Sequence, residues 1–140
     1  MSDPRPLSPI QWVEAARWLE RARDDPNIVD VLLAQPTPSL FGLSLHCQQA
    51  AEKLAKAMLI AFGVRPPHIH DIGELAELVA DVHASIGLEI KNLTQLTAWY
   101  ISSRYPDIAI ESLPGLDDIR LAAASLRQLC DRIATLAPQA

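Results

Sequence analysis

The stretch HCQQAAEKLAKAML, residues 46–59, decides the expected fold of this 140-residue chain. Small and apolar side chains recur in it every three or four residues, which places them on one face of an α-helix. The same spacing continues on both sides, from about Ser39 to Phe62. The pattern therefore predicts one long helix with a continuous core face, and its alanines allow neighbouring backbones to approach closely.

Eleven prolines divide the rest of the chain into further helical intervals. Proline removes a backbone donor and clashes with the preceding helical turn, so it favours helix ends. No interval shows the sustained alternation of a β-strand. The expected helices run from Ser8 to the RDDPN segment at 23–27, from Ser39 to Phe62, from Asp71 through Val82, from Ile90 to Ser103 and from Leu116 to Leu136. We predict an all-α fold, an up-and-down bundle of four to five antiparallel helices, formed by residues 1–140 as a single domain with its core at about 8–136.

Local signals support several of these helix limits. Ser8 is a predicted N-cap, and Pro9 suits the first helical position. Asp71 is a predicted cap for the third helix, with Glu74 three residues further on. Gly63 is a predicted C-terminal stop for the second helix.

The composition narrows the functional class. Apolar residues make up 49% and charged residues 21% of the chain, which excludes a disordered or fibrous protein. The formal net charge of −5 argues against a protein coated in basic surface for non-specific DNA binding. Cys47 and Cys130 fall on apolar helix faces, and we expect two buried reduced thiols. With no leader pattern and no apolar run of about 20 residues, we expect a soluble cytoplasmic protein without membrane contact.

Three segments, taken in order, resemble the HEPN family: HCQQAAEKLAKAML at 46–59, HDIGEL at 70–75 and SRYPD at 103–107. The resemblance covers roughly residues 8–136. It implies a helical bundle that commonly forms a homodimer and that pairs with a minimal nucleotidyltransferase in a toxin–antitoxin-type module. Many family members are metal-independent ribonucleases, whose signature is an arginine followed, after four to six residues, by a histidine.

A polar flank lies beside the core face of the second predicted helix. His46, Gln49, Lys53 and Lys56 recur at three, four and three residues, so they share one face. One interpretation is a solvated surface with an ordinary Glu52–Lys56 pair. The other is a wall of donors that faces a cleft for phosphate or base. With the resemblance included, the sequence supports the cleft interpretation as strongly as the solvated surface.

The RYPD segment is the second candidate for ligand binding. The Arg104 guanidinium offers a planar fork of donors for phosphate, and Tyr105 can stack on a base. In the alternative, Tyr105 packs against the bundle and Arg104 pairs with an acid such as Asp107. No histidine follows Arg104 in the window that the ribonuclease signature requires. RNA cleavage by general acid–base catalysis needs a proton-transfer group near neutral pH, so this absence favours binding over catalysis.

The RPPHIH segment at 65–70 fits the arginine–histidine spacing literally, with Arg65 and His70. Its two prolines stiffen it, and His70 already matches the helix start in the resemblance, so capping, or lining the same cleft, is the preferred role. A metal held by His68, His70 and Asp71 is disfavoured against a polar loop with a cap. We therefore predict no metal and no cofactor.

Two hypotheses follow. The first is a HEPN-like helical bundle that binds a nucleotide or RNA through Arg104, Tyr105, His46, Gln49, Lys53 and His70. The second is a metal-independent endoribonuclease that uses Arg104 or Arg65 with His70. On the first helix, Arg17 and Arg21 lie one turn apart among glutamates, which indicates a solvated face. Trp18 on that helix is a candidate partner contact.

Overall fold

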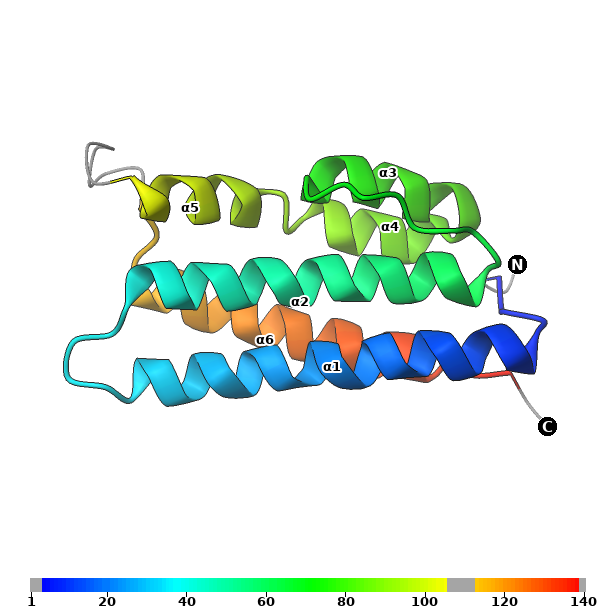
Figure 1. Ribbon diagram of the computed structural model, residues 1–140, viewed down its shortest axis with the longest axis horizontal. Coiled ribbons are helices and arrows are strands. Elements are labelled where there is room, and N and C mark those ends of the chain that lie inside the picture. Colours follow the sequence, from blue (N-terminus) through cyan, green and yellow to red (C-terminus); the bar gives the residue numbers. More distant parts are fainter. Residues whose placement is uncertain (1–3, 106–112, 139–140) are drawn as a thin grey trace.

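The computed structural model describes residues 4–105 and 113–138, and these ranges contain helices and no strand. The helices are α1 (Pro9–Leu33), α2 (Leu40–Ala61), α3 (Ile72–Val82), α4 (Ala84–Lys91), α5 (Gln95–Arg104) and α6 (Leu116–Ala134). The three long helices α1, α2 and α6 pack together, and α3, α4 and α5 run along the side of α2 away from α1 (Figure 1). The predicted all-α bundle is confirmed.

Helix α2 is the centre of the bundle, because it packs against α1, α3, α5 and α6. The side chains that the sequence places on its core face are all buried: Leu43, Cys47, Ala50, Leu54, Met58 and Ala61. Alanines at 51, 55 and 57 are buried as well, which lets the neighbouring helices lie close. The core face predicted for residues 39–62 is confirmed, and the polar flank of α2 is left for other contacts.

The predicted caps are present. The Ser8 hydroxyl accepts the backbone N–H of Gln11 at 3.3 Å, and the Asp71 carboxylate accepts that of Glu74 at 2.9 Å. Gly63 follows α2 with a φ of 78°, a left-handed conformation that glycine adopts without strain. Each cap satisfies a backbone group that the helix end leaves without a partner.

The first helix is longer than the sequence predicts. It does not end at the RDDPN segment, because α1 continues through Pro26 to Leu33. Proline within a helix costs about 3 kcal/mol. Asp25, Pro26 and Val29 are buried against the rest of the bundle, and Arg127 donates to the Pro26 carbonyl at 3.1 Å. This burial and tertiary contact offset the local cost, so the predicted helix end was wrong.

The predicted helix from Ile90 to Ser103 is also wrong, because two helices occupy this region and α4 already begins at residue 84. His83 starts α4, since its Nδ1 accepts the backbone N–H of Ile86 at 3.1 Å. A Cβ on Gly87 would lie 2.5 Å from the Cα of Ala80, so only glycine allows α4 to approach α3 this closely. The cap at His83 and the close approach at Gly87 leave no trace in the spacing of apolar residues, which is why the spacing did not predict this short helix.

Both cysteines are buried and free of disulfide bonds, as the sequence predicts. Burial raises the pKa of Cys47 to about 12 and that of Cys130 to about 11. Both thiols are therefore protonated at neutral pH and act as apolar core groups rather than nucleophiles. Within the described ranges, no helix is both long enough and apolar enough to cross a membrane.

Candidate functional site

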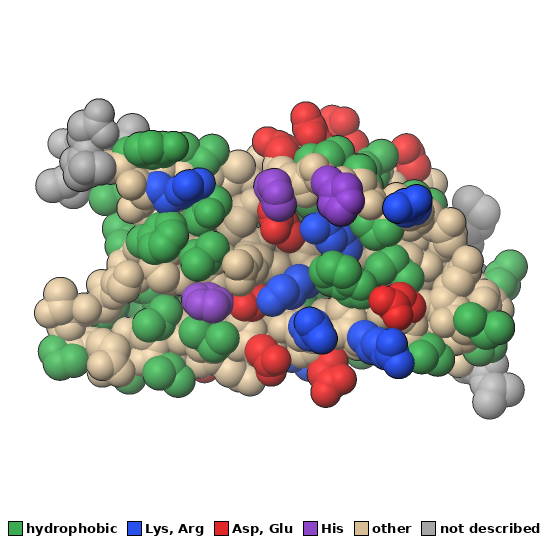
Figure 2. All heavy atoms as spheres, in the orientation of Figure 1, with side chains coloured by type: hydrophobic (Ala, Val, Ile, Leu, Met, Phe, Trp, Pro, Cys, Tyr) green, Lys and Arg blue, Asp and Glu red, His purple; other side chains and the backbone are tan. Residues whose placement is uncertain are grey.

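A hollow of about 570 Å³ lies between the polar flank of α2, the segment before α3 and the helix α5. We call it the Arg104 hollow. Its lining residues are Leu45, Gln48, Gln49, Glu52, His70, Asp71, Thr97, Tyr100, Ile101 and Arg104. Histidine and charged side chains gather on the face where α2 meets α1 and the segment before α3 (Figure 2).

Gln48 holds the walls of this hollow together. Its side chain is buried, and its Nε2 donates to the His70 carbonyl at 2.6 Å and to Glu52 Oε1 at 3.3 Å. The Thr97 hydroxyl donates to Gln48 Oε1 at 3.3 Å and accepts the backbone N–H of Ile72 at 3.2 Å. One amide of α2 thus connects the segment before α3 with α5. The first glutamine of the QQAAEK run is therefore a positioning residue.

His70 is oriented by a carboxylate. Its Nδ1 lies 3.0 Å from Glu52 Oε1, and the Glu52 side chain is only 13% exposed, whereas that of His70 is 80% exposed. A carboxylate partner at Nδ1 keeps the proton on that nitrogen and leaves Nε2 as an acceptor. His70 is therefore held with one ring nitrogen fixed and the other available to a ligand.

Arg104 lies at the end of α5 with an aromatic ring beneath it. Its guanidinium carbon is 5.3 Å from the centroid of the Tyr100 ring, and Tyr100 stacks on Phe41 with ring centroids 5.9 Å apart. Within residues 4–105 and 113–138, Arg104 takes part in no ion pair. Asp107, the acid that the sequence offers as its partner, lies outside the described residues. The stacked ring restricts the orientation of the guanidinium beside the hollow.

The sequence proposed Tyr105 as a stacking surface for a base, whereas the aromatic ring that lies under Arg104 is that of Tyr100. Tyr105 is exposed and does not line the hollow. Tyr100 stands four residues before Arg104 on the same helix, the spacing that brings side chains into contact. This spacing in the sequence could have predicted the contact between Tyr100 and Arg104.

A second hollow, of about 700 Å³, lies between α1 and α2. We call it the Asp25 hollow. It is lined by Glu14, Arg17, Trp18, Arg21, Asp24, Asp25, Ile28, His46, Gln49 and Lys53. Gln49 lines this hollow and the Arg104 hollow, so the two lie next to each other on the polar flank of α2.

Asp25 is the centre of this second cluster. Its side chain is 2% exposed, with Oδ1 2.9 Å from His46 Nδ1 and Oδ2 2.8 Å from Lys53 Nζ. Both basic side chains of α2 are thereby turned toward α1. Sequence reasoning missed Asp25 because it placed a helix end there. Its register with Ala22 and Val29, both buried on the inner face of α1, was the signal.

The predicted site residues are thus divided between two hollows. Gln49, His70 and Arg104 share one, and His46, Gln49 and Lys53 share the other. Arg65 is exposed and lines neither. The side chain of Lys56 lies over the Trp18 ring at 5.7 Å. Over the residues that the structure describes, no group of three or more His, Cys, Asp or Glu side chains is placed to hold a metal ion.

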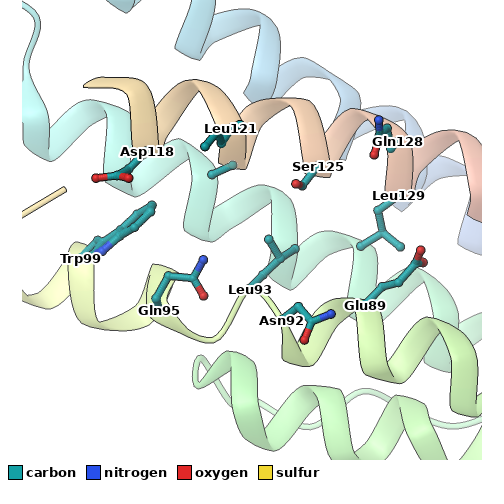
Figure 3. A pocket seen from close by; sticks show the side chains of 11 residues that line it. Glu89, Asn92, Leu93, Gln95, Trp99, Asp118, Leu121, Ser125, Gln128 and Leu129 are labelled. Atoms are coloured by element: carbon teal, nitrogen blue, oxygen red, sulfur yellow. The ribbon is translucent and has the colours of Figure 1, made fainter. Parts of the chain in front are cut away.

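A third hollow, of about 330 Å³, lies on another side of the bundle, where α4 and α5 meet α6. Figure 3 shows Trp99 and Gln95 on one wall and Asp118 and Leu121 on the other. Two carboxylates, from Glu89 and Asp118, line this hollow, and Glu89 pairs with Arg132 of α6. The lining itself contains no lysine or arginine to bind a phosphate, so the hollow is a poor site for a nucleotide.

Comparison with known proteins identifies the family. The family model of the HEPN domain matches residues 15–134, a range that contains α2 to α6 and most of α1. No curated protein and no solved structure matches the chain. The HEPN match supports a nucleotide- or RNA-related role, because HEPN domains are often ribonucleases, and the family often dimerises. The chain belongs to the HEPN domain family.

Proposed function

We propose that this HEPN domain binds a nucleotide or RNA in the Arg104 hollow and acts with a nucleotidyltransferase partner in a toxin–antitoxin-type module. The observation that carries the binding site is the convergence of Arg104, backed by Tyr100, and His70, held by Glu52, on one hollow. The resemblance of the three motifs to the family supports the partner.

The chemistry of the lining suits a phosphate with a base attached. Arg104 offers a planar set of donors for phosphate oxygens, and the nearby amide of Gln49 suits the edge of a base. The two carboxylates of the lining already have partners in the protein: Glu52 meets His70, and Asp71 accepts the Glu74 N–H. Arg104 is therefore the cation left for a ligand among the lining groups.

The alternative is a metal-independent endoribonuclease, and one observation favours it. His70 supplies the proton-transfer group that is missing after Arg104, since it lines the same hollow and Glu52 fixes its tautomer. In this reaction His70 Nε2 accepts the proton of a ribose 2′-hydroxyl while Arg104 holds the phosphate. The 2′-oxygen attacks phosphorus, the bond to the 5′-oxygen breaks, and that oxygen takes a proton from water. The products are a 2′,3′-cyclic phosphate and a 5′-hydroxyl.

The assembly and setting remain part of the proposal. We propose a homodimer that works in the cytoplasm without a cofactor, as the resemblance and the composition imply. Light scattering of the purified chain gives the mass of the assembly directly, and a monomer at micromolar concentration contradicts the dimer.

One experiment separates binding from cleavage. Labelled RNA and ATP are titrated with the wild type, Arg104→Ala and Arg120→Ala, and the same RNA is incubated in EDTA with each of these three proteins and with His70→Ala. Arg120 is a matched control, because it is an exposed arginine on α6 that pairs with Asp117. Binding that weakens only in Arg104→Ala, without cleavage, supports the binding module. Cleavage lost in Arg104→Ala and His70→Ala supports the ribonuclease, and binding that is equal in all three proteins contradicts the site.

A further inference from the structure

The Asp25 hollow adjoins the Arg104 hollow, and its chemistry parallels that of its neighbour. Each hollow contains an arginine, an aromatic side chain and a histidine whose Nδ1 meets a carboxylate. In the Asp25 hollow these are Arg21, Trp18 and His46. The shared lining residue is Gln49, at the middle of the polar flank of α2.

Within the described ranges, the ion pairs of the Asp25 hollow leave two charged lining residues without a partner, Arg21 and Asp24. Asp25 is met by Lys53 and His46, and Arg17 pairs with Glu14 at 3.6 Å. No carboxylate of the described ranges lies within ion-pair distance of Arg21. Trp18 lines the same hollow with Lys56 over its ring, so an aromatic surface and a second cation are close to Arg21.

The two arginines lie on the two helices that border the polar flank of α2. Arg21 belongs to α1 and Arg104 to α5, and both helices pack on α2. A helix with its side chains is about 10–12 Å across, so a single phosphate does not contact both arginines. A ligand that contacts both needs at least two phosphates, as a chain of nucleotides has.

We propose that the ligand is a single-stranded oligonucleotide that crosses α2, with one phosphate on Arg104 and a further phosphate on Arg21. Trp18 then serves as a base-stacking surface of the second subsite, in the way that single-strand-binding proteins combine aromatic rings with a basic track. This inference rests on the proposed function, since it extends the Arg104 site and identifies its substrate class. It assigns Arg21 and Trp18, which the sequence placed on a solvated face and at a partner contact.

Competition binding tests the inference. AMP and single-stranded RNAs of two, four and eight nucleotides compete with a labelled octanucleotide for the wild type, Arg104→Ala, Arg21→Ala and Arg23→Ala. Arg23 is the matched control, because it lies on the same helix and binds Asp131 of α6 at 2.9 Å. All three arginines are exposed, and a thermal melt of each variant checks that it is folded.

We expect the tetranucleotide to bind at least about tenfold more tightly than AMP, because it makes a second charged contact. Arg21→Ala should weaken the tetranucleotide and the octanucleotide by about five- to tenfold and leave AMP unchanged. It should also lower the salt dependence of octanucleotide binding by about one phosphate contact, a change of roughly 0.7 in the slope. Asp24→Asn removes a negative charge from the same hollow and should tighten the octanucleotide but not AMP.

The outcomes separate this inference from the proposed function. If Arg104→Ala weakens every ligand but Arg21→Ala weakens none, the second subsite is wrong and the Arg104 site stands. If AMP binds as tightly as the octanucleotide, the ligand is a mononucleotide and the inference is wrong. If no nucleotide binds, or if binding ignores Arg104, the proposed function itself is overturned.

Discussion

Replacing Asp25 with alanine should destabilise the domain, because this carboxylate of α1 holds two basic side chains of the polar flank of α2. The carboxylate is 2% exposed and accepts one hydrogen bond from Lys53 at 2.8 Å and one from His46 at 2.9 Å. A hydrogen bond to a charged group contributes about 1.5–3 kcal/mol, which sums to about 3–6 kcal/mol for the two. The side chains of Lys53 and His46 are 27% and 23% exposed, so both regain part of this energy by turning to water. We expect a loss of about 2–4 kcal/mol in the free energy of unfolding.

The substitution Asp25→Asn distinguishes the contribution of the charge at position 25 from that of the side chain's volume. It keeps the volume of the side chain and can still accept from Lys53, but it loses the charge. We expect about 1–2 kcal/mol of destabilisation for Asp25→Asn, between the wild type and Asp25→Ala. A double-mutant cycle with Lys53→Met should give a coupling above about 1 kcal/mol, because the two groups touch.

Urea unfolding, followed by circular dichroism and by tryptophan fluorescence, measures these differences. The matched control is Asp24→Asn, because Asp24 is the exposed neighbour of Asp25 and forms no ion pair in the described part of the chain. Its effect should stay within about 0.5 kcal/mol. An Asp25→Ala variant as stable as Asp24→Asn would refute the reasoning, since the buried carboxylate would then contribute nothing.

Three further predictions concern the packing. Gly87→Ala should lower the free energy of unfolding by about 1–3 kcal/mol, because the new Cβ would lie 2.5 Å from the Cα of Ala80. The control is Gly115→Ala, whose Cβ would lie 3.5 Å from Asp118 Oδ2, and it should cost at most about 1 kcal/mol. Equal melting temperatures for the two variants would contradict this prediction. Burial raises the pKa of Cys47 from the ordinary 9.0 to about 12, so the unfolded chain loses this proton first as the pH rises. The thiol's contribution to the free energy of unfolding is therefore complete below pH 9 and falls above it, by about 1.4 kcal/mol per pH unit up to about 12. Urea titrations of Cys47→Ala should show that its free energy of unfolding falls less between pH 9 and 10 than that of the wild type. The same fall in both proteins would count against the raised pKa. Gln48→Leu removes the amide that connects α2 with α5 and should cost about 1–3 kcal/mol; an unfolding midpoint equal to that of the wild type would exclude this role.

The sequence predicts those parts of the fold that depend on local chemistry. The core face of α2 follows from a period of three to four residues, and the caps at Ser8 and Asp71 follow from side chains that bond their own backbone. These signals lie within a few residues of each other, so they can be read without knowing the rest of the structure.

The features that sequence reasoning missed depend on contacts between distant residues. The helix α1 runs through Pro26 because neighbouring helices bury that turn, and α4 lies close against α3 because Gly87 has no side chain to meet Ala80. A local penalty of about 3 kcal/mol at a proline is smaller than what tertiary packing can return. No local pattern carries that information.

The candidate site was predicted in composition but not in arrangement. The polar flank of α2 and Arg104 were both identified, whereas the sequence joined His46 and Lys53 to the same cleft as His70 and Arg104. Asp25 turns the first two toward α1, which divides the set. Which of two adjacent helices a polar side chain faces depends on the partner there, and the sequence does not give that partner.

The most direct test of the central claim is a map of the bound ligand on the molecule. Backbone and side-chain amide signals of the isotope-labelled protein are followed by NMR while a single-stranded RNA tetranucleotide is added. The largest shifts should fall on Gln49, His70, Thr97 and Arg104, around the Arg104 hollow. Shifts that instead gather at the hollow between α5 and α6, near Trp99, would contradict the assignment of the nucleotide site.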